Sequence, residues 1–191
     1  MRRLPGIRKI SWPALVVVVF ILLGQQWGWF DQASQTIVDV QPGFFRVTKF
    51  DDGDTVSVDM NGVNETIRFI GVDTPETHDP RKAVQCFGYA AAAYTKNLIG
   101  ENPVRLAADP LNTNRDRYNR LLRYVYLPNG RLVNAEIIKA GYGFAYTSFP
   151  MQKADEFRAY QKEARAQGKG LWSSCKPAAN QYGGYTANDA N

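Results

Sequence analysis

Histidine and cysteine are scarce in this chain: among its 191 residues there is one histidine, His78, and there are two cysteines. A general acid and base pair built from two histidines is therefore excluded, and so is a zinc site that needs several imidazoles. His78 is a single histidine in a predicted loop, where such a residue is more often solvated than functional. Any catalysis in this chain therefore depends on carboxylates, arginines and hydroxyl groups.

A broad excess of positive charge is also missing. The formal net charge is +5, but four of the basic residues precede the first acidic residue, Asp31, so the rest of the chain is close to neutral. The sequence therefore does not indicate a uniformly basic nucleic-acid-binding protein. Five arginines accompany a single acidic residue in one stretch: Arg115, Arg117, Arg120, Arg123 and Arg131. Such a stretch can meet phosphates, although on its own it is more often a solvated pair of strands.

The first 31 residues combine a basic flank with a mostly apolar segment, Ile10–Phe30. About 20 apolar residues suffice to span a bilayer, and a positive flank keeps that end in the cytoplasm. Trp27 and Trp29 are typical of a membrane interface and unlike the small residues of a cleavage site. We expect residues 1–31 to form an uncleaved transmembrane signal anchor in the cell membrane and residues 32–41 a linker. Secretion after cleavage is the alternative.

The two cysteines, Cys86 and Cys175, both lie in the part of the chain that this anchor would place outside the cytoplasm. An oxidising compartment favours a disulfide between them. Such a bond would tie an early helix to the end of the domain. Two separate buried thiols are the alternative.

The remaining chain shows strand patterns first and helical patterns later. The Asn61-Gly62 pair is a strong hairpin signal between two strand-like runs. The patterns predict strands at 44–50, 55–60 and 63–72, a helix at 83–99, strands at 104–108 and 121–127, and helices at about 134–141 and 154–167. This order fits a mainly β domain with some α (α+β), a five-stranded OB-type barrel with about three packed helices over residues 42–176. Residues 177–191 have no periodic apolar face and are predicted to be disordered.

Two aspartates stand at matching ends of the predicted hairpin. Asp54 opens the second strand and Asp73 closes the third. Because paired antiparallel strands bring the start of one beside the end of the other, the two carboxylates are expected to converge. With a main-chain or hydroxyl oxygen they form a hard oxygen site for calcium or magnesium, and a weak one because it holds so few charges.

Two arginines accompany these carboxylates in the sequence. Arg68 lies five residues before Asp73, and Arg120 ends the segment Asp116-Arg117-Tyr118-Asn119-Arg120. Guanidinium groups bind phosphate oxygens bidentately, and a metal with two arginines can neutralise the extra charge of a pentacoordinate phosphorus. The combination predicts phosphoryl chemistry, whereas each arginine alone is more often a surface residue.

These segments together resemble the staphylococcal nuclease (thermonuclease) family. The resemblance covers about residues 40–172 and rests on four strings: Asp52-Gly53-Asp54-Thr55, Arg68 with Val72-Asp73-Thr74-Pro75-Glu76-Thr77, Asp116-Arg117-Tyr118-Asn119-Arg120, and Gly170-Leu171-Trp172. It implies an OB-type barrel and calcium-dependent hydrolysis of phosphodiester bonds in DNA and RNA, with 3′-phosphate ends as product. A monomer that prefers single strands is expected.

The resemblance also implies roles by position. Asp54 and Asp73 correspond to calcium ligands, with the carbonyl of Thr74 as a third. Glu76 corresponds to the group that orients or deprotonates the attacking water.

On the same basis, Arg68 and Arg120 would bind the scissile phosphate, and Arg120 would also assist the leaving oxygen. Tyr118, Tyr146 and Arg117 would contact the nucleotide.

One departure and one alternative remain open. Asn119 stands where the family commonly has glycine, which puts the aim of Arg120 in question. The alternative function is a catalytically silent OB-type module that binds nucleic acid or protein. Such modules lose site residues, whereas Arg68, Glu76, Arg120 and both aspartates are present here. The sequence therefore favours the enzyme.

Overall fold

The computed structural model describes residues 43–77, 83–180 and 184–189. The predicted anchor and linker therefore lie outside the described residues, as does His78. None of the helices within these described ranges is long and apolar enough to cross a bilayer.

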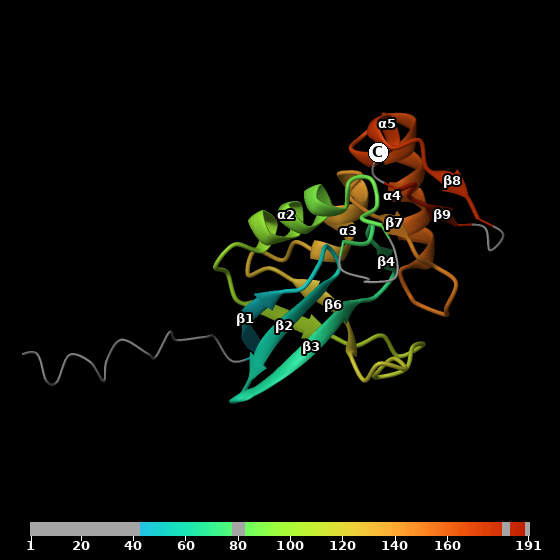
Figure 1. Ribbon diagram of the computed structural model, residues 1–191. Helices are drawn as coiled ribbons and strands as arrows, with labels where there is room; N and C mark the ends of the chain where they lie inside the picture. The colour runs from blue at the N-terminus through green and yellow to red at the C-terminus, as the bar shows by residue number, and fades with distance from the viewer. Residues whose placement is uncertain (1–42, 78–82, 181–183, 190–191) are drawn as a thin grey trace, which may run out of the picture. The chain divides into compact units, whose positions relative to one another are not determined.

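Five strands close into a barrel (Figure 1). They are β1 Phe44–Phe50, β2 Thr55–Met60, β3 Val63–Phe69, β5 Val104–Ala107 and β6 Leu121–Tyr126, in the order β1-β2-β3-β6-β5. All neighbouring pairs are antiparallel except β3 and β6, which run parallel. Fully buried Val56, Val58, Ile67 and Val125 help to fill the interior. The predicted five-stranded barrel is confirmed.

The β2–β3 hairpin turns at Asn61 and Gly62, whose φ angles are 58° and 85°. Two consecutive positive φ angles match the twist of the flanking strands, and asparagine and glycine tolerate them best. The turn fixes a register in which Thr55 faces Arg68. As a result, the N–H of Phe69 donates to the carbonyl of Asp54 at 2.9 Å, so the start of β2 lies beside the end of β3.

The third strand is shorter than predicted, because it ends at Phe69 instead of Val72. Gly71, with φ 73°, redirects the chain in a tight turn, where an added Cβ would lie 2.8 Å from Phe157. The chain then continues as β4, Val72–Asp73, which pairs with β7, Phe144–Ala145. Asp73 therefore belongs to a small second sheet beside the barrel.

The described residues contain four helices instead of about three: α2 Gly88–Ile99, α3 Val133–Lys139, α4 Ala154–Ala166 and α5 Leu171–Ser174. The first begins five residues later than predicted, since Phe87 adopts a left-handed conformation with φ 72°. Fully buried Asn134 attaches α3 to the barrel: its Oδ1 accepts from the N–H of Val125 at 2.9 Å, and its Nδ2 donates to the carbonyl of Ile70 at 2.9 Å. The carbonyl of Ile70, next to the turn at Gly71, is thereby fixed.

The C-terminal part of the chain is ordered where it is described. Cys86 and Cys175, 89 residues apart, form the predicted disulfide. Beyond it, β8 (Ala178–Ala179) pairs with β9 (Tyr185–Thr186), and Ala187 is buried. Disorder was therefore the wrong prediction for the described part of 177–191. A short pairing next to a covalent cross-link orders this segment without the periodic apolar face on which the prediction relied.

Candidate functional site

Asp54, Arg68 and Asp73 form a group that we name the carboxylate cluster. The Nη2 atom of Arg68 lies 3.1 Å from Oδ2 of Asp54 and 3.1 Å from Oδ1 of Asp73. Its Nη1 atom donates to the carbonyl of Val72 at 2.6 Å, which holds the guanidinium against the turn before Asp73. The hairpin and the turn at Gly71 thus bring the two predicted metal ligands to the same nitrogen.

Burial differs sharply within the cluster. The side chain of Asp54 is 5% exposed, that of Arg68 15% and that of Asp73 49%. Asp54 also accepts hydrogen bonds from the N–H of Thr74 at 2.8 Å and from the hydroxyl of Thr55 at 3.1 Å. Burial opposes the charge on Arg68, but the carboxylates of Asp54 and Asp73 outweigh it and raise the pKa of the guanidinium. The cluster therefore has a fixed, charged interior and one carboxylate open to solvent.

The turn before β2 supports Asp54 from below. The N–H of Asp54 donates to Oδ1 of Asp52 at 3.0 Å, and the hydroxyl of Thr95 in α2 donates to the carbonyl of Gly53 at 2.6 Å. A Cβ on Gly53 would lie 2.8 Å from the side chain of Thr74, so only glycine fits there without displacing it. Burial and the charge of Asp54 raise the pKa of Asp52 to about 7. The carboxyl group of Asp52 therefore adds less negative charge near neutral pH than that of an ordinary aspartate.

The donor set of the cluster suits a hard divalent cation. Within the described ranges, no three His, Cys, Asp or Glu side chains gather in a way that could hold a metal. The available ligands are the carboxylates of Asp54 and Asp73 and neighbouring threonine oxygens, which calcium and magnesium prefer over softer metals. Thr74 is held beside Asp54 by its N–H. These residues fit a cation that completes its shell with water or substrate oxygens.

Residues 115–120, which we name the arginine loop, lead into β6. Nε of Arg120 donates to Oδ2 of Asp116 at 2.8 Å, and Oδ1 of Asp116 accepts from the N–H groups of Tyr118 at 2.9 Å and Arg120 at 3.0 Å. Burial opposes the ionisation of Asp116, but the hydrogen bonds from Arg120 outweigh it and lower the pKa of this carboxyl. Asp116 therefore organises the loop, a role that the sequence motif alone did not assign.

The exposed part of the arginine loop surrounds Tyr118, a residue that is 61% exposed. The guanidinium carbons of Arg117 and Arg120 lie 4.8 Å and 5.3 Å from the centre of its ring. Nη2 of Arg117 also donates to the tyrosine hydroxyl at 2.8 Å. Arg115 instead forms a bidentate pair with Glu65 of β3, with both N–O distances 2.9 Å. Arg117, Tyr118 and Arg120 therefore form one polar and aromatic surface.

The parallel pairing of β3 with β6 places the arginine loop next to the cluster. Ile67 faces Leu121, and these residues directly adjoin Arg68 and Arg120. The charge of Asp116 also contributes to the raised pKa of Arg68. The two predicted phosphate-binding arginines thus come from neighbouring strand ends.

Glu76 follows β4, and Gln85 binds both of its main-chain polar groups. The N–H of Glu76 donates to Oε1 of Gln85 at 2.8 Å, and the N–H of Gln85 donates to the carbonyl of Glu76 at 2.9 Å. The side chain of Glu76 also accepts from the N–H of Thr77 at 2.9 Å. Sequence reasoning missed Gln85, because a glutamine before a helix forms no recognisable motif.

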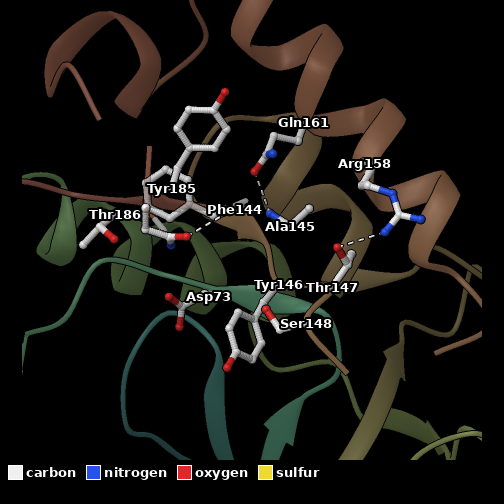
Figure 2. A pocket seen from close by; sticks show the side chains of 12 residues that line it. Asp73, Phe144, Ala145, Tyr146, Thr147, Ser148, Arg158, Gln161, Tyr185 and Thr186 are labelled. Carbon is white, nitrogen blue, oxygen red and sulfur yellow. Dashed lines mark hydrogen bonds between the residues drawn. The ribbon is translucent and has the colours of Figure 1, made fainter. Parts of the chain in front are cut away.

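A cleft of about 320 Å³ opens beside Asp73 (Figure 2). Tyr146 lies on its wall, and its N–H donates to the carbonyl of Gly71 at 2.9 Å. The ring of Tyr146 packs edge-on against Phe149, with centroids 5.8 Å apart. Tyr185 of β9 contributes to the same cleft, so the C-terminal segment helps to form the surface next to the cluster.

Comparison with known proteins identifies the family of this chain. Residues 66–174 match the family described as staphylococcal nuclease homologue. This chain belongs to the staphylococcal nuclease family. It is 35% identical over 162 residues to a thermonuclease of Staphylococcus hyicus. This match covers 84% of this chain and 93% of that protein. It is also 35% identical over 163 residues to a thermonuclease of Staphylococcus intermedius, covering 83% of this chain and 91% of that protein.

A bacillary relative is longer than the matched segment. The chain is 37% identical over 132 residues to endonuclease YncB of Bacillus subtilis, which corresponds to 68% of this chain and 62% of that protein. The match thus spans less than two thirds of this relative.

Proposed function

We propose that this protein is a calcium-dependent nuclease that hydrolyses phosphodiester bonds of DNA and RNA and leaves 3′-phosphate ends. The observation that carries the proposal is the carboxylate cluster, in which Arg68 bridges buried Asp54 and half-exposed Asp73 beside the arginine loop. The names thermonuclease and endonuclease of its relatives support it.

In the proposed reaction, Asp54, Asp73 and the carbonyl of Thr74 would hold the calcium ion. When bound, the ion polarises the phosphoryl group and offsets negative charge that develops on it. Arg68 and Arg120 bind the phosphate oxygens through their N–H groups and stabilise the same charge.

Water attacks the phosphorus, and the bond to the 5′ oxygen breaks, which leaves a 3′-phosphate and a 5′-hydroxyl. Glu76 orients this water or accepts its proton. Arg120 donates a hydrogen bond to the departing oxygen. The main-chain hydrogen bonds of Glu76 support such a role, since a group that positions water must itself be held in place.

Nucleotide binding falls to the exposed aromatic surfaces. Tyr118 and Tyr146 offer rings for stacking, and Arg117 offers a cation next to Tyr118. Stacking on such rings requires bases that are free of a partner strand. We therefore propose a preference for single-stranded substrates, bound by a monomer.

The protein would act at the outer face of the cell membrane, anchored by residues 1–31. The disulfide between Cys86 and Cys175 supports an oxidising location. Sequencing the N-terminus of the mature protein tests this: retention of the apolar segment is expected, whereas a start near Ser34 would indicate a secreted form.

Digestion of single-stranded DNA and of RNA by the purified full chain tests the activity. We expect cleavage with calcium, little with magnesium alone and none with chelator, and end-group analysis should find 3′-phosphates. A folded sample that binds DNA but cleaves it under none of these conditions would contradict the proposal and favour the binding module.

A further inference from the structure

We propose that Gln85 is a positioning residue for Glu76, and that the C-terminal residues 187–189 hold Gln85 in place. The inference rests on the proposed function, in which Glu76 acts on water. Its first observation is that both main-chain polar groups of Glu76 bond to Gln85, at 2.8 Å and 2.9 Å. One glutamine therefore determines the path of the chain through Glu76.

The C-terminal segment pairs with the other side of Gln85. Nε2 of Gln85 donates to the carbonyl of Ala187 at 3.3 Å, and the N–H of Cys86 donates to the carbonyl of Asn188 at 2.7 Å. Gln85 and Asp189 form an antiparallel bridge. The side-chain amide of Gln85 thus connects Glu76, through its oxygen, to the end of the chain, through its nitrogen.

Three features keep residues 187–189 against Gln85. Ala187 is buried in a small core with Phe144 and Leu171. Nδ2 of Asn188 donates to the carbonyls of Cys175 at 3.2 Å and Lys176 at 3.1 Å. The disulfide between Cys86 and Cys175 joins the residue after Gln85 to the residue that Asn188 contacts. Residues 187–189 are therefore held next to Gln85 by packing and hydrogen bonds, against a segment that the disulfide ties to Cys86.

The start of α2 closes the arrangement on the other flank. A Cβ on Gly88 would lie 2.7 Å from the side chain of Thr77 and 3.0 Å from the carbonyl of Glu76. The chain at Glu76 thus has close contact with Gly88 as well as two bonds to Gln85. Since a shift of about 1 Å in a reacting group can cost about 100-fold in rate, such bracing bears directly on turnover.

Four variants, two of them shortened, are compared with the full-length wild type to test the inference. They are Gln85→Ala, a chain ending at Lys176, the two changes combined, and the exposed Gln167→Ala as a matched control. We expect Gln85→Ala to lower kcat at least tenfold with KM changed less than twofold, because substrate contacts remain. The shortened chain should lose less, and the combined variant no more than Gln85→Ala, because both changes act through one residue. Gln167→Ala should match the wild type.

Hydrogen exchange at the amide of Glu76 gives a readout independent of turnover. It should accelerate in Gln85→Ala and in the shortened chain, while amides in the barrel strands keep their protection. Unchanged exchange at Glu76, or unchanged kcat in Gln85→Ala while Glu76→Gln is impaired, would overturn the inference alone. Additive losses in the combined variant would overturn the part played by residues 187–189. A wild type without nuclease activity would contradict the proposed function and the catalytic role of Gln85. In that case, hydrogen exchange at Glu76 would still show whether Gln85 and residues 187–189 hold the chain at Glu76 in place.

Discussion

In both the carboxylate cluster and the arginine loop, an arginine is paired with a carboxylate, but the two pairs differ in burial. Arg68 is 15% exposed and lies between two aspartates, one of them almost fully buried. Arg120 is 28% exposed and pairs with Asp116 inside its own loop, four residues away. One arginine is thus built into the fold, while the other belongs to a local surface motif.

Because of this difference in burial, substitutions in the two regions should affect folding stability and turnover differently. Removing one partner of a buried charge pair leaves the other charge uncompensated, which lowers folding stability strongly. Exposed charge pairs contribute only about 0–1 kcal/mol to folding stability. Substitutions in the cluster should therefore impair folding and turnover together. Substitutions in the arginine loop should impair turnover with little effect on folding.

The largest effect is expected for Arg68→Ala. It leaves Asp54 buried without its cationic partner, so we expect a loss of about 3 kcal/mol in the free energy of unfolding. It also removes a proposed contact to phosphate. Turnover should fall at least about 1,000-fold. Denaturant unfolding and initial rates measure the two losses. Near wild-type stability would show that the ion pairs of Arg68 are not structural.

Arg120→Ala should affect turnover alone. The loss of its proposed hydrogen bonds to phosphate should lower kcat about 100-fold or more, with a change in unfolding free energy below about 1 kcal/mol. The same two measurements apply, and Arg115→Ala, which removes the neighbouring pair with Glu65, is a matched control. If both arginine variants lost activity equally, the loop would act through its shape and not through Arg120.

A smaller effect is expected at Asn119, which has φ 65°. Glycine and asparagine tolerate this left-handed conformation, whereas other residues are strained by about 1–2 kcal/mol. Asn119→Gly should therefore preserve activity and stability. Asn119→Ala should lose about 1 kcal/mol and a few-fold in kcat, as thermal unfolding and rate measurements would detect. Equal behaviour of the two variants would show that the backbone at this position does not aim Arg120.

The smallest effect is expected for Arg117→Ala, at the exposed rim of the loop. It removes a cation beside Tyr118 but no proposed contact to the scissile phosphate. We expect KM to rise a few-fold, kcat to stay within about twofold, and stability to change by less than about 0.5 kcal/mol. A large fall in kcat would instead place Arg117 at the reacting phosphate.

Local chemistry explains which parts of the fold could be predicted. Asn61-Gly62 determines a two-residue turn, so the hairpin and the facing ends of β2 and β3 follow from the sequence. The meeting of Asp54 with Asp73 was predicted for the same reason. The turn at Gly71, however, packs closely against Met151 and Phe157, and local sequence does not encode these contacts.

Other features depend on contacts between distant segments. Gln85 bonds to Glu76 and to Ala187, and its position before α2 gave no motif. The start of α2 was placed too early because helical periodicity continued through Gln85–Phe87, whereas tertiary contacts hold those residues outside the helix. The end of the chain is ordered by the disulfide and by the packing of Ala187. Neither contact leaves a periodic pattern in the local sequence, so disorder was predicted there.

We propose above all that the carboxylate cluster binds the metal ion and that the arginine loop binds the phosphate. Cleavage rate measured against calcium concentration, for the wild type, Asp73→Asn and Arg120→Ala, tests it most directly. We predict that Asp73→Asn moves the half-maximal calcium concentration at least tenfold upward, while Arg120→Ala lowers the maximal rate without moving it. Equal calcium midpoints in all three proteins, or cleavage that needs no calcium, would contradict the account.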